Sequence, residues 1–150
     1  MLEVYTDGSA EERVGKPGGW AFVVVRSEEV LLTSNGGAPS TTSLVMELEA
    51  ALAGLRAVVT RGWHLVNVIE LISDSSIALD IAAGRFMPRK HVALATSLRE
   101  TARDARANTR WVRAHSGHRW NEVVDALARE AKRRVSPHPD PLPRGEREGR

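Results

Sequence analysis

The sequence predicts an α/β domain in which a mixed β-sheet is flanked by helices. Two observations indicate this class. Short β-prone runs fill the first part of the chain, and a helical pattern at 43–60 is followed by a continuous apolar run at 65–72. A strand, a helix and a buried strand in this order are typical of the crossover unit of α/β proteins.

Three strands are expected before the helix, at 2–6, 20–25 and 30–34. Asp7 and Gly8 are typical turn residues and should end the first strand. The glycine pair at 18–19 is assigned to the loop before the second strand, and the pair at 36–37 to the end of the third.

The helix at 43–60 carries leucines at helical spacing, at positions 44, 48, 52 and 55. Gly62, just after this pattern, is expected to end the helix. The run at 65–72 predicts a strand covered on both faces. Further helices are expected at 75–83, 91–107 and 121–134, with a short strand at 109–114.

The composition is that of one ordinary globular domain. Of the 150 residues, 42% are apolar and 27% are charged. The absence of cysteine excludes disulfides, zinc–thiolate sites and a thiol nucleophile. The N-terminus lacks the pattern of a signal peptide, and no run approaches the ~20 apolar residues that span a bilayer. We therefore expect a cytoplasmic protein without a membrane partner.

We expect the domain to cover residues 1–135, with Trp20 and Trp111 in its core. The last residues, 136–150, contain four prolines and no apolar periodicity. This composition predicts a disordered tail.

Three acidic residues should meet at one edge of the sheet. Asp7 follows the first strand and Asp74 follows the buried strand, and the carboxyl ends of parallel neighbours share one crevice. Glu47 lies early in the helix within the buried stripe, where an unpaired carboxylate is costly. Crowded carboxylates raise each other's pKa unless a cation neutralises them. Oxygen ligands without cysteine fit magnesium or manganese.

Two of these acids, and the basic residues, also have an ordinary interpretation. Asp74 could be the N-cap of the helix that follows it, and Asp7 could serve only a turn. Basic residues gather between 99 and 134, among them Arg99, Arg103 and Arg106. They fit phosphate neutralisation, but also a solvated helix face.

Four sequence blocks resemble the type 1 ribonuclease H family. They are YTDGS at 5–9 with GGW at 18–20, MELEA at 46–50, SDSS at 73–76 and WVRAHSGHRWNEVVDALA at 111–128. With the order of strands and helices they cover nearly all of residues 1–134, and the last block is the most specific. The resemblance implies a ribonuclease H-like three-layer fold, whose five-stranded mixed sheet has the order 3-2-1-4-5.

The resemblance also implies a site and a reaction. Two magnesium ions, or manganese in their place, would be held with substrate by four acids: Asp7, Glu47, Asp74 and Asp125. By analogy, His115 would assist proton transfer or product release, and Asn121 would orient the acids. The reaction would be endonucleolytic hydrolysis of the RNA strand of RNA/DNA hybrids by a monomer, leaving 5′-phosphate and 3′-hydroxyl ends. Periodicity alone makes Asp125 an ordinary helix acid, so its role rests on the resemblance.

The chain differs from many family members at the positions that contact substrate. Many bacterial members carry amides before the metal-binding glutamate and after the third acid, whereas here hydroxyls stand at Thr42, Ser43 and Ser76. Backbone amides near Gly8 and Ser9 could supply further contacts. The chain also has no room for the basic helix and loop of some members. We therefore expect weaker hybrid binding, with a flatter dependence on salt.

Three alternatives stay open on the sequence alone. A different nuclease or strand-transfer protein with the same fold would act on DNA. A hybrid-binding module would have lost catalysis. The four acids could also serve only to stabilise the fold through a bound ion.

Overall fold

The computed structural model describes residues 1–11, 13 and 15–136. Residues 137–150, which make up nearly all of the predicted tail, lie outside the described part. The strands are β1 (Leu2–Ala10), β2 (Lys16–Arg26), β3 (Glu29–Thr41), β4 (Ile69–Ser73) and β5 (Asn108–Trp111). The helices are α1 (Ser43–Thr60), α2 (Ser76–Ala82), α3 (Val92–Ala105) and α4 (Arg119–Val135), with a 3₁₀ turn η1 (Trp63–Leu65).

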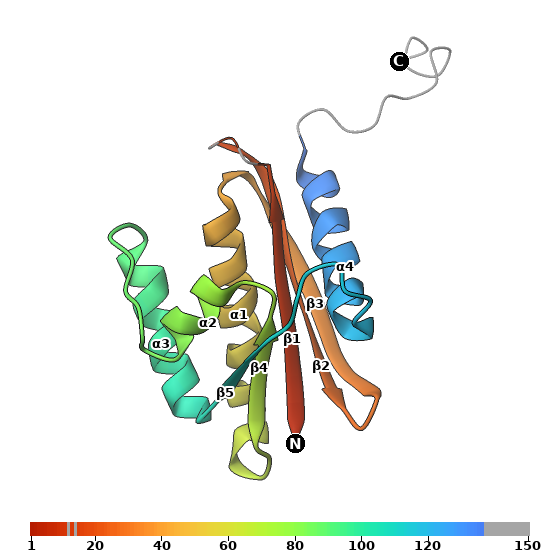
Figure 1. Ribbon diagram of the computed structural model, residues 1–150, viewed down its shortest axis with the longest axis vertical. Helices are drawn as coiled ribbons and strands as arrows, with labels where there is room; N and C mark the ends of the chain where they lie inside the picture. Colours follow the sequence, from red (N-terminus) through yellow and green to blue (C-terminus); the bar gives the residue numbers. More distant parts are fainter. Residues whose placement is uncertain (12, 14, 137–150) are drawn as a thin grey trace.

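The strands form one mixed sheet in the order β3-β2-β1-β4-β5, which confirms the predicted order. β1, β2 and β3 pair antiparallel as a meander. β4 pairs parallel with β1, and β5 pairs parallel with β4. α1 crosses from β3 to β4, so the predicted crossover unit is present (Figure 1).

The sheet is the middle of three layers. α1, α2 and α3 lie on one side of it and α4 lies on the other, against β1, β2 and β3 (Figure 1). None of the helices among the described residues combines the length and the apolar character that a bilayer crossing needs.

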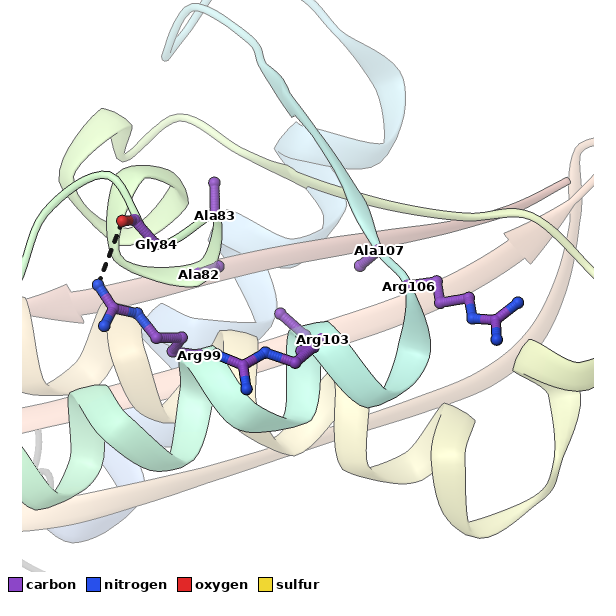
Figure 2. A pocket seen from close by; sticks show the side chains of 8 residues that line it. Ala82, Ala83, Gly84, Arg99, Arg103, Arg106 and Ala107 are labelled. Atoms are coloured by element: carbon purple, nitrogen blue, oxygen red, sulfur yellow. Dashed lines mark hydrogen bonds between the residues drawn. The ribbon is translucent and has the colours of Figure 1, made fainter.

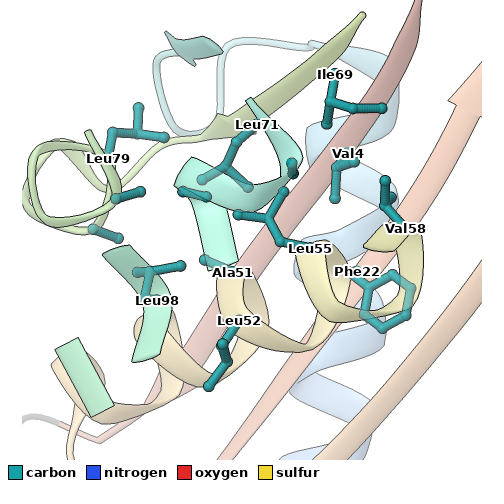
Figure 3. Packing of buried hydrophobic residues seen from close by; sticks show 14 of the residues in the cluster. Val4, Phe22, Ala51, Leu52, Leu55, Val58, Ile69, Leu71, Leu79 and Leu98 are labelled. Atoms are coloured by element: carbon teal, nitrogen blue, oxygen red, sulfur yellow. The ribbon is translucent and has the colours of Figure 1, made fainter. Parts of the chain in front are cut away.

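Each face of the sheet carries its own apolar core because successive side chains of a strand point to opposite faces. Val4 and Leu71 belong to the larger cluster, beneath α1 and α3, where Leu55 and Leu98 are fully buried (Figure 3). Their chain neighbours Tyr5 and Ile72 belong to the smaller cluster, on the side of α4. The leucine stripe of the helix at 43–60 thus packs against the sheet as its spacing predicts.

The glycine pairs in β2 and β3 do not end strands, so the strand ends predicted there are wrong. A Cβ atom on Gly19 would stand 2.2 Å from the carbonyl oxygen of Ala128 in α4. A Cβ atom on Gly37 would stand 2.9 Å from the carbonyl oxygen of Ala131. Glycine at these positions lets α4 lie close to two strands, and both strands continue through them.

The predicted strand at 65–72 is too long at its beginning. β4 starts at Ile69, and the side chains of Leu65 and Val66 are 77% and 82% exposed. Gly62 adopts a left-handed conformation with φ of 70° after α1, and η1 follows it. The apolar residues of that turn therefore lie outside the sheet. Trp111, expected in the core, ends the edge strand β5 and is 52% exposed.

Candidate active site

Asp7 lies inside β1, and not at its end as predicted. Its partner in the antiparallel pairing is Ala21, and β1 continues along β2 to Ala10. The parallel pairing of β1 with β4 stops at Tyr5, and Asp74 directly follows the last residue of β4. Asp7 and Asp74 therefore reach the same edge of the sheet from neighbouring strands.

Glu47 completes a cluster of three carboxylates. It lies in the second turn of α1, which begins with Thr42 as its N-cap. One carboxylate oxygen from each of Asp7, Glu47 and Asp74 lies within 4.8 Å of the other two. These residues are 40 and 27 positions apart in the sequence, so the fold alone brings their charges together.

Gly8 sets how closely β1 approaches α1. A Cβ atom at this position would stand 2.5 Å from the backbone nitrogen of Glu47 and 2.6 Å from the carbonyl carbon of Met46. Any side chain here would push α1 away from the strand. The N–H of Gly8 also donates to Asp7 Oδ1 at 2.9 Å. Gly8 therefore positions two acids at once.

The carboxylates strongly disfavour one another's ionisation in the absence of a cation. Burial raises the pKa of Asp7 to about 9, and the charges of Glu47, Asp74 and Asp125 add to that rise. Burial and the charge of Asp74 raise the pKa of Glu47 to about 8, against a smaller lowering by the Gly8 backbone. The pKa of Asp74 is also raised, chiefly by burial. Without a cation, ionising the three carboxyl groups together would therefore destabilise the folded state.

The donor set fits a hard divalent cation. All three residues offer carboxylate oxygens, the ligands that magnesium and manganese prefer. Glu47 Oε2 is buried and has no hydrogen-bond partner within the described residues. A buried acceptor without a partner is costly, and a cation held by the cluster would supply one.

Asp125 approaches the cluster from the other side of the sheet. It lies on α4, close enough to Asp7 for its carboxylate to raise the pKa of that residue. It is not part of the group of three whose oxygens lie within 4.8 Å. Asp125 Oδ2 also pairs with Arg129 Nε at 3.2 Å, one turn along the helix. The structure thus places Asp125 at the rim of the cluster.

Two neighbours hold Asp74. Asn121 Nδ2, on the buried face of α4, donates to Asp74 Oδ2 at 3.3 Å. Trp111 Nε1 donates to the carbonyl oxygen of Asp74 at 3.1 Å. The sequence did not predict this contact of Trp111, because a tryptophan at the end of a strand is equally compatible with a place in the core. The N-cap of α2 is Ser75, whose Oγ accepts from the N–H of Ala78 at 3.2 Å, so Asp74 does not cap this helix.

A family model described as RNase H matches residues 1–133. The chain belongs to the ribonuclease H family. A protein named Ribonuclease H from Legionella pneumophila is 33% identical over 140 residues, which cover 85% of this chain and 93% of that protein. A Ribonuclease H from Campylobacter curvus is 29% identical over 137 residues, covering 86% and 91%. These matches confirm the predicted family and the predicted class of enzyme, an endoribonuclease.

Solved structures of RNase H domains share the fold. The N-terminal RNase H domain of a Mycobacterium tuberculosis protein superposes with a TM-score of 0.77 at 23% identity, covering 89% of this chain and 94% of that one. LC11 RNase H1, solved in complex with an RNA/DNA hybrid, gives a TM-score of 0.73 at 21% identity, covering 90% and 99%. The predicted ribonuclease H-like three-layer fold is thereby confirmed.

His115 lies in the loop between β5 and α4. It is exposed, has a φ of 53° and stands near enough to Asp74 for its charge to lower the pKa of that carboxyl. Gly117, two residues on, has a φ of 82°. The imidazole of this RNase H family member thus lies on a loop, near enough to Asp74 to interact with its charge.

The residues predicted to contact substrate lie in β1 and at the starts of α1 and α2. Thr42 Oγ1 accepts from the N–H of Val45 at 3.2 Å and so caps α1. Ser43 and Ser76 are the exposed first residues of α1 and α2. Ser9 pairs with Gly19 in the β1–β2 ladder.

Proposed function

We propose that this chain cleaves the RNA strand of RNA/DNA hybrids endonucleolytically, leaving 5′-phosphate and 3′-hydroxyl ends. The observation that carries the proposal is the convergence of Asp7, Glu47 and Asp74, with oxygens within 4.8 Å, in a member of the ribonuclease H family. The structural likeness to LC11 RNase H1, which was solved with such a hybrid, supports the choice of substrate.

The cofactor we propose is a pair of magnesium ions, with manganese as a substitute. Asp7, Glu47, Asp74 and Asp125 would hold them. When bound, such ions lower the pKa of a coordinated water and neutralise the charge that develops on a phosphate. The buried oxygen of Glu47 without a partner, and the raised pKa values of the acids, support a cation at this place.

The chain's own side chains would keep the acids oriented during turnover. Asn121 fixes one oxygen of Asp74, and Trp111 fixes the backbone of the same residue. Gly8 keeps Glu47 and Asp7 at their short separation. We assign His115 to proton transfer or product release, because an exposed imidazole on a loop can reach both the cluster and solvent.

Recognition of the hybrid would use mainly hydroxyl groups. Thr42, Ser43 and Ser76 stand at the first turns of α1 and α2, and hydroxyls can bond to the 2′-hydroxyl groups that distinguish RNA from DNA. The Gly8 amide is already engaged by Asp7. Ser9 is paired with Gly19 in the β1–β2 ladder, so the hydroxyl of Ser9 is its better candidate for a substrate contact. Shorter side chains than amides should give weaker binding.

One experiment separates the reaction from its rivals. Labelled RNA/DNA hybrid, duplex DNA and duplex RNA are incubated with the full chain, with magnesium or with a chelator. We expect cleavage of the hybrid alone, and only with metal. Cleavage of DNA, or cleavage that survives the chelator, would overturn the proposal. Binding of hybrid without cleavage would instead indicate a module that has lost catalysis. The expected monomeric state and cytoplasmic location stay predictions.

A further inference from the structure

A second concave site lies away from the acid cluster. A hollow of about 550 Å³ is bounded by the end of α2, by α3 and by the turn that leads into β5 (Figure 2). Four alanines line it: Ala82, Ala83, Ala102 and Ala107. Their short side chains leave the space open, and its volume is in the range that small ligands occupy.

The hollow is strongly positive. Arg99 and Arg103 lie four residues apart on the same face of α3, and Arg106 follows at its C-cap. No acidic residue lines the hollow, and within the described residues none of these three arginines forms an ion pair. Five arginines elsewhere in that part of the chain are paired with acids: Arg85, Arg110, Arg119, Arg129 and Arg134. Within the described residues, no ion pair therefore compensates the charge in the hollow.

Arg99 is held in place and keeps a donor unused. Its Nη2 donates to the carbonyl oxygen of Gly84 at 3.2 Å (Figure 2). Its Nε is buried and has no partner within the described residues. Gly84 has a φ of 81°, and a Cβ atom built on it would stand 3.5 Å from that Nε. Arg99 therefore lines the hollow with its side chain anchored on the turn at Gly84.

We propose that this hollow is a phosphate-binding site, separate from the acid cluster. Guanidinium groups present planar, paired donors that match phosphate oxygens, and they stay charged at all physiological pH values. The phosphate belongs either to a free nucleotide or to a nucleic-acid strand. A strand is within reach because α2 links the two sites: Asp74 precedes its first turn, and Ala82 ends it. Seven helical residues span roughly 10 Å.

The test uses the full chain, labelled with ¹⁵N and kept in chelator so that the acid cluster holds no metal. It is titrated with inorganic phosphate against chloride at matched ionic strength. We expect the NMR chemical shifts of the backbone amides of Gly84 and residues 102–107 to change and to reach saturation. The variant R103Q/R106Q should bind at least about tenfold more weakly, since each charge-assisted hydrogen bond lost is worth a tenfold change or more. Both side chains are exposed, so the variant should fold normally.

The control variant is R26Q/R56Q, which removes the same charge from two exposed arginines outside the hollow. It should bind phosphate like the unaltered chain. Equal weakening in both variants, or shifts that rise without saturation, would overturn the proposal and leave a solvated basic helix face. The source of the phosphate follows from two further titrations, with a nucleoside 5′-monophosphate and with a short RNA/DNA hybrid. Whichever shifts the same amides at the lower concentration is the natural class of ligand.

Discussion

Replacing Asp7 by asparagine should make the metal-free protein more stable while it abolishes turnover. The side chain of Asp7 is only 4% exposed, and three other carboxylates act on it. Asparagine keeps its size and an oxygen, and removes its charge. The substitution should therefore remove the repulsion between Asp7 and the other carboxylates without leaving a cavity.

The magnitude follows from the pKa. Asp7 titrates at 3.8 ordinarily and at about 9 in the folded protein. Between these values the folded chain holds a proton that the unfolded chain has lost, so stability falls as pH rises through this window. At pH 7 the difference of about 3 pH units corresponds to roughly 4 kcal/mol, at about 1.4 kcal/mol per unit. This is an upper bound because Glu47 and Asp74 share the same repulsion, and we expect a gain of about 1–4 kcal/mol.

Urea denaturation in chelator, at pH 4 and at pH 7, measures the effect. Asp7→Asn should be more stable than the unaltered chain at pH 7. At pH 4 the two should agree to within about 1 kcal/mol, because the folded carboxyl is protonated and the unfolded one is close to its own pKa of 3.8. Asp104→Asn, at an exposed acid of α3, should show no gain at pH 7. With magnesium, hybrid cleavage by Asp7→Asn should fall below detection. A variant that is no more stable at pH 7, or equally stabilised at both pH values, would refute the reasoning. A variant that fails to fold would favour a purely structural ion.

Three further substitutions probe the site. His115→Ala should slow turnover by roughly 100-fold or less with KM nearly unchanged, whereas His91→Ala, at an exposed histidine before α3, should not; an inactive H115A would assign the imidazole a larger role. Gly8→Ala should destabilise the fold by about 1–3 kcal/mol or more through overpacking against α1, and Ser9→Ala should not; equal melting temperatures for the two variants would contradict the close packing. Trp111→Phe removes the N–H that Asp74 accepts and should lower kcat several-fold with less than about 1 kcal/mol lost in stability. Trp63→Phe is its control, and an unchanged kcat for W111F would show that the contact does not orient the acid.

The outline of the fold could be predicted because its signals are local. The leucine spacing of α1 and the apolar run that contains β4 depend only on neighbours in sequence. The glycines of β2 and β3 were misassigned because glycine serves turns and close contacts alike. Only the position of α4 against Gly19 and Gly37 distinguishes these two uses. Likewise, the exposure of Leu65 depends on where the sheet ends.

The sequence by itself indicated the family through its motifs, and the resemblance to that family implied the order of the sheet. The sequence also singled out the four candidate acids, Asp125 only through the resemblance. Tertiary structure decided how the acids are arranged: three within 4.8 Å, with Asp125 at the rim and paired to Arg129. It also decided that Trp111 holds Asp74 and that three arginines share one hollow. Desolvation, repulsion and hydrogen bonding depend on distances through space, and residues far apart in sequence acquire those distances only when the chain folds.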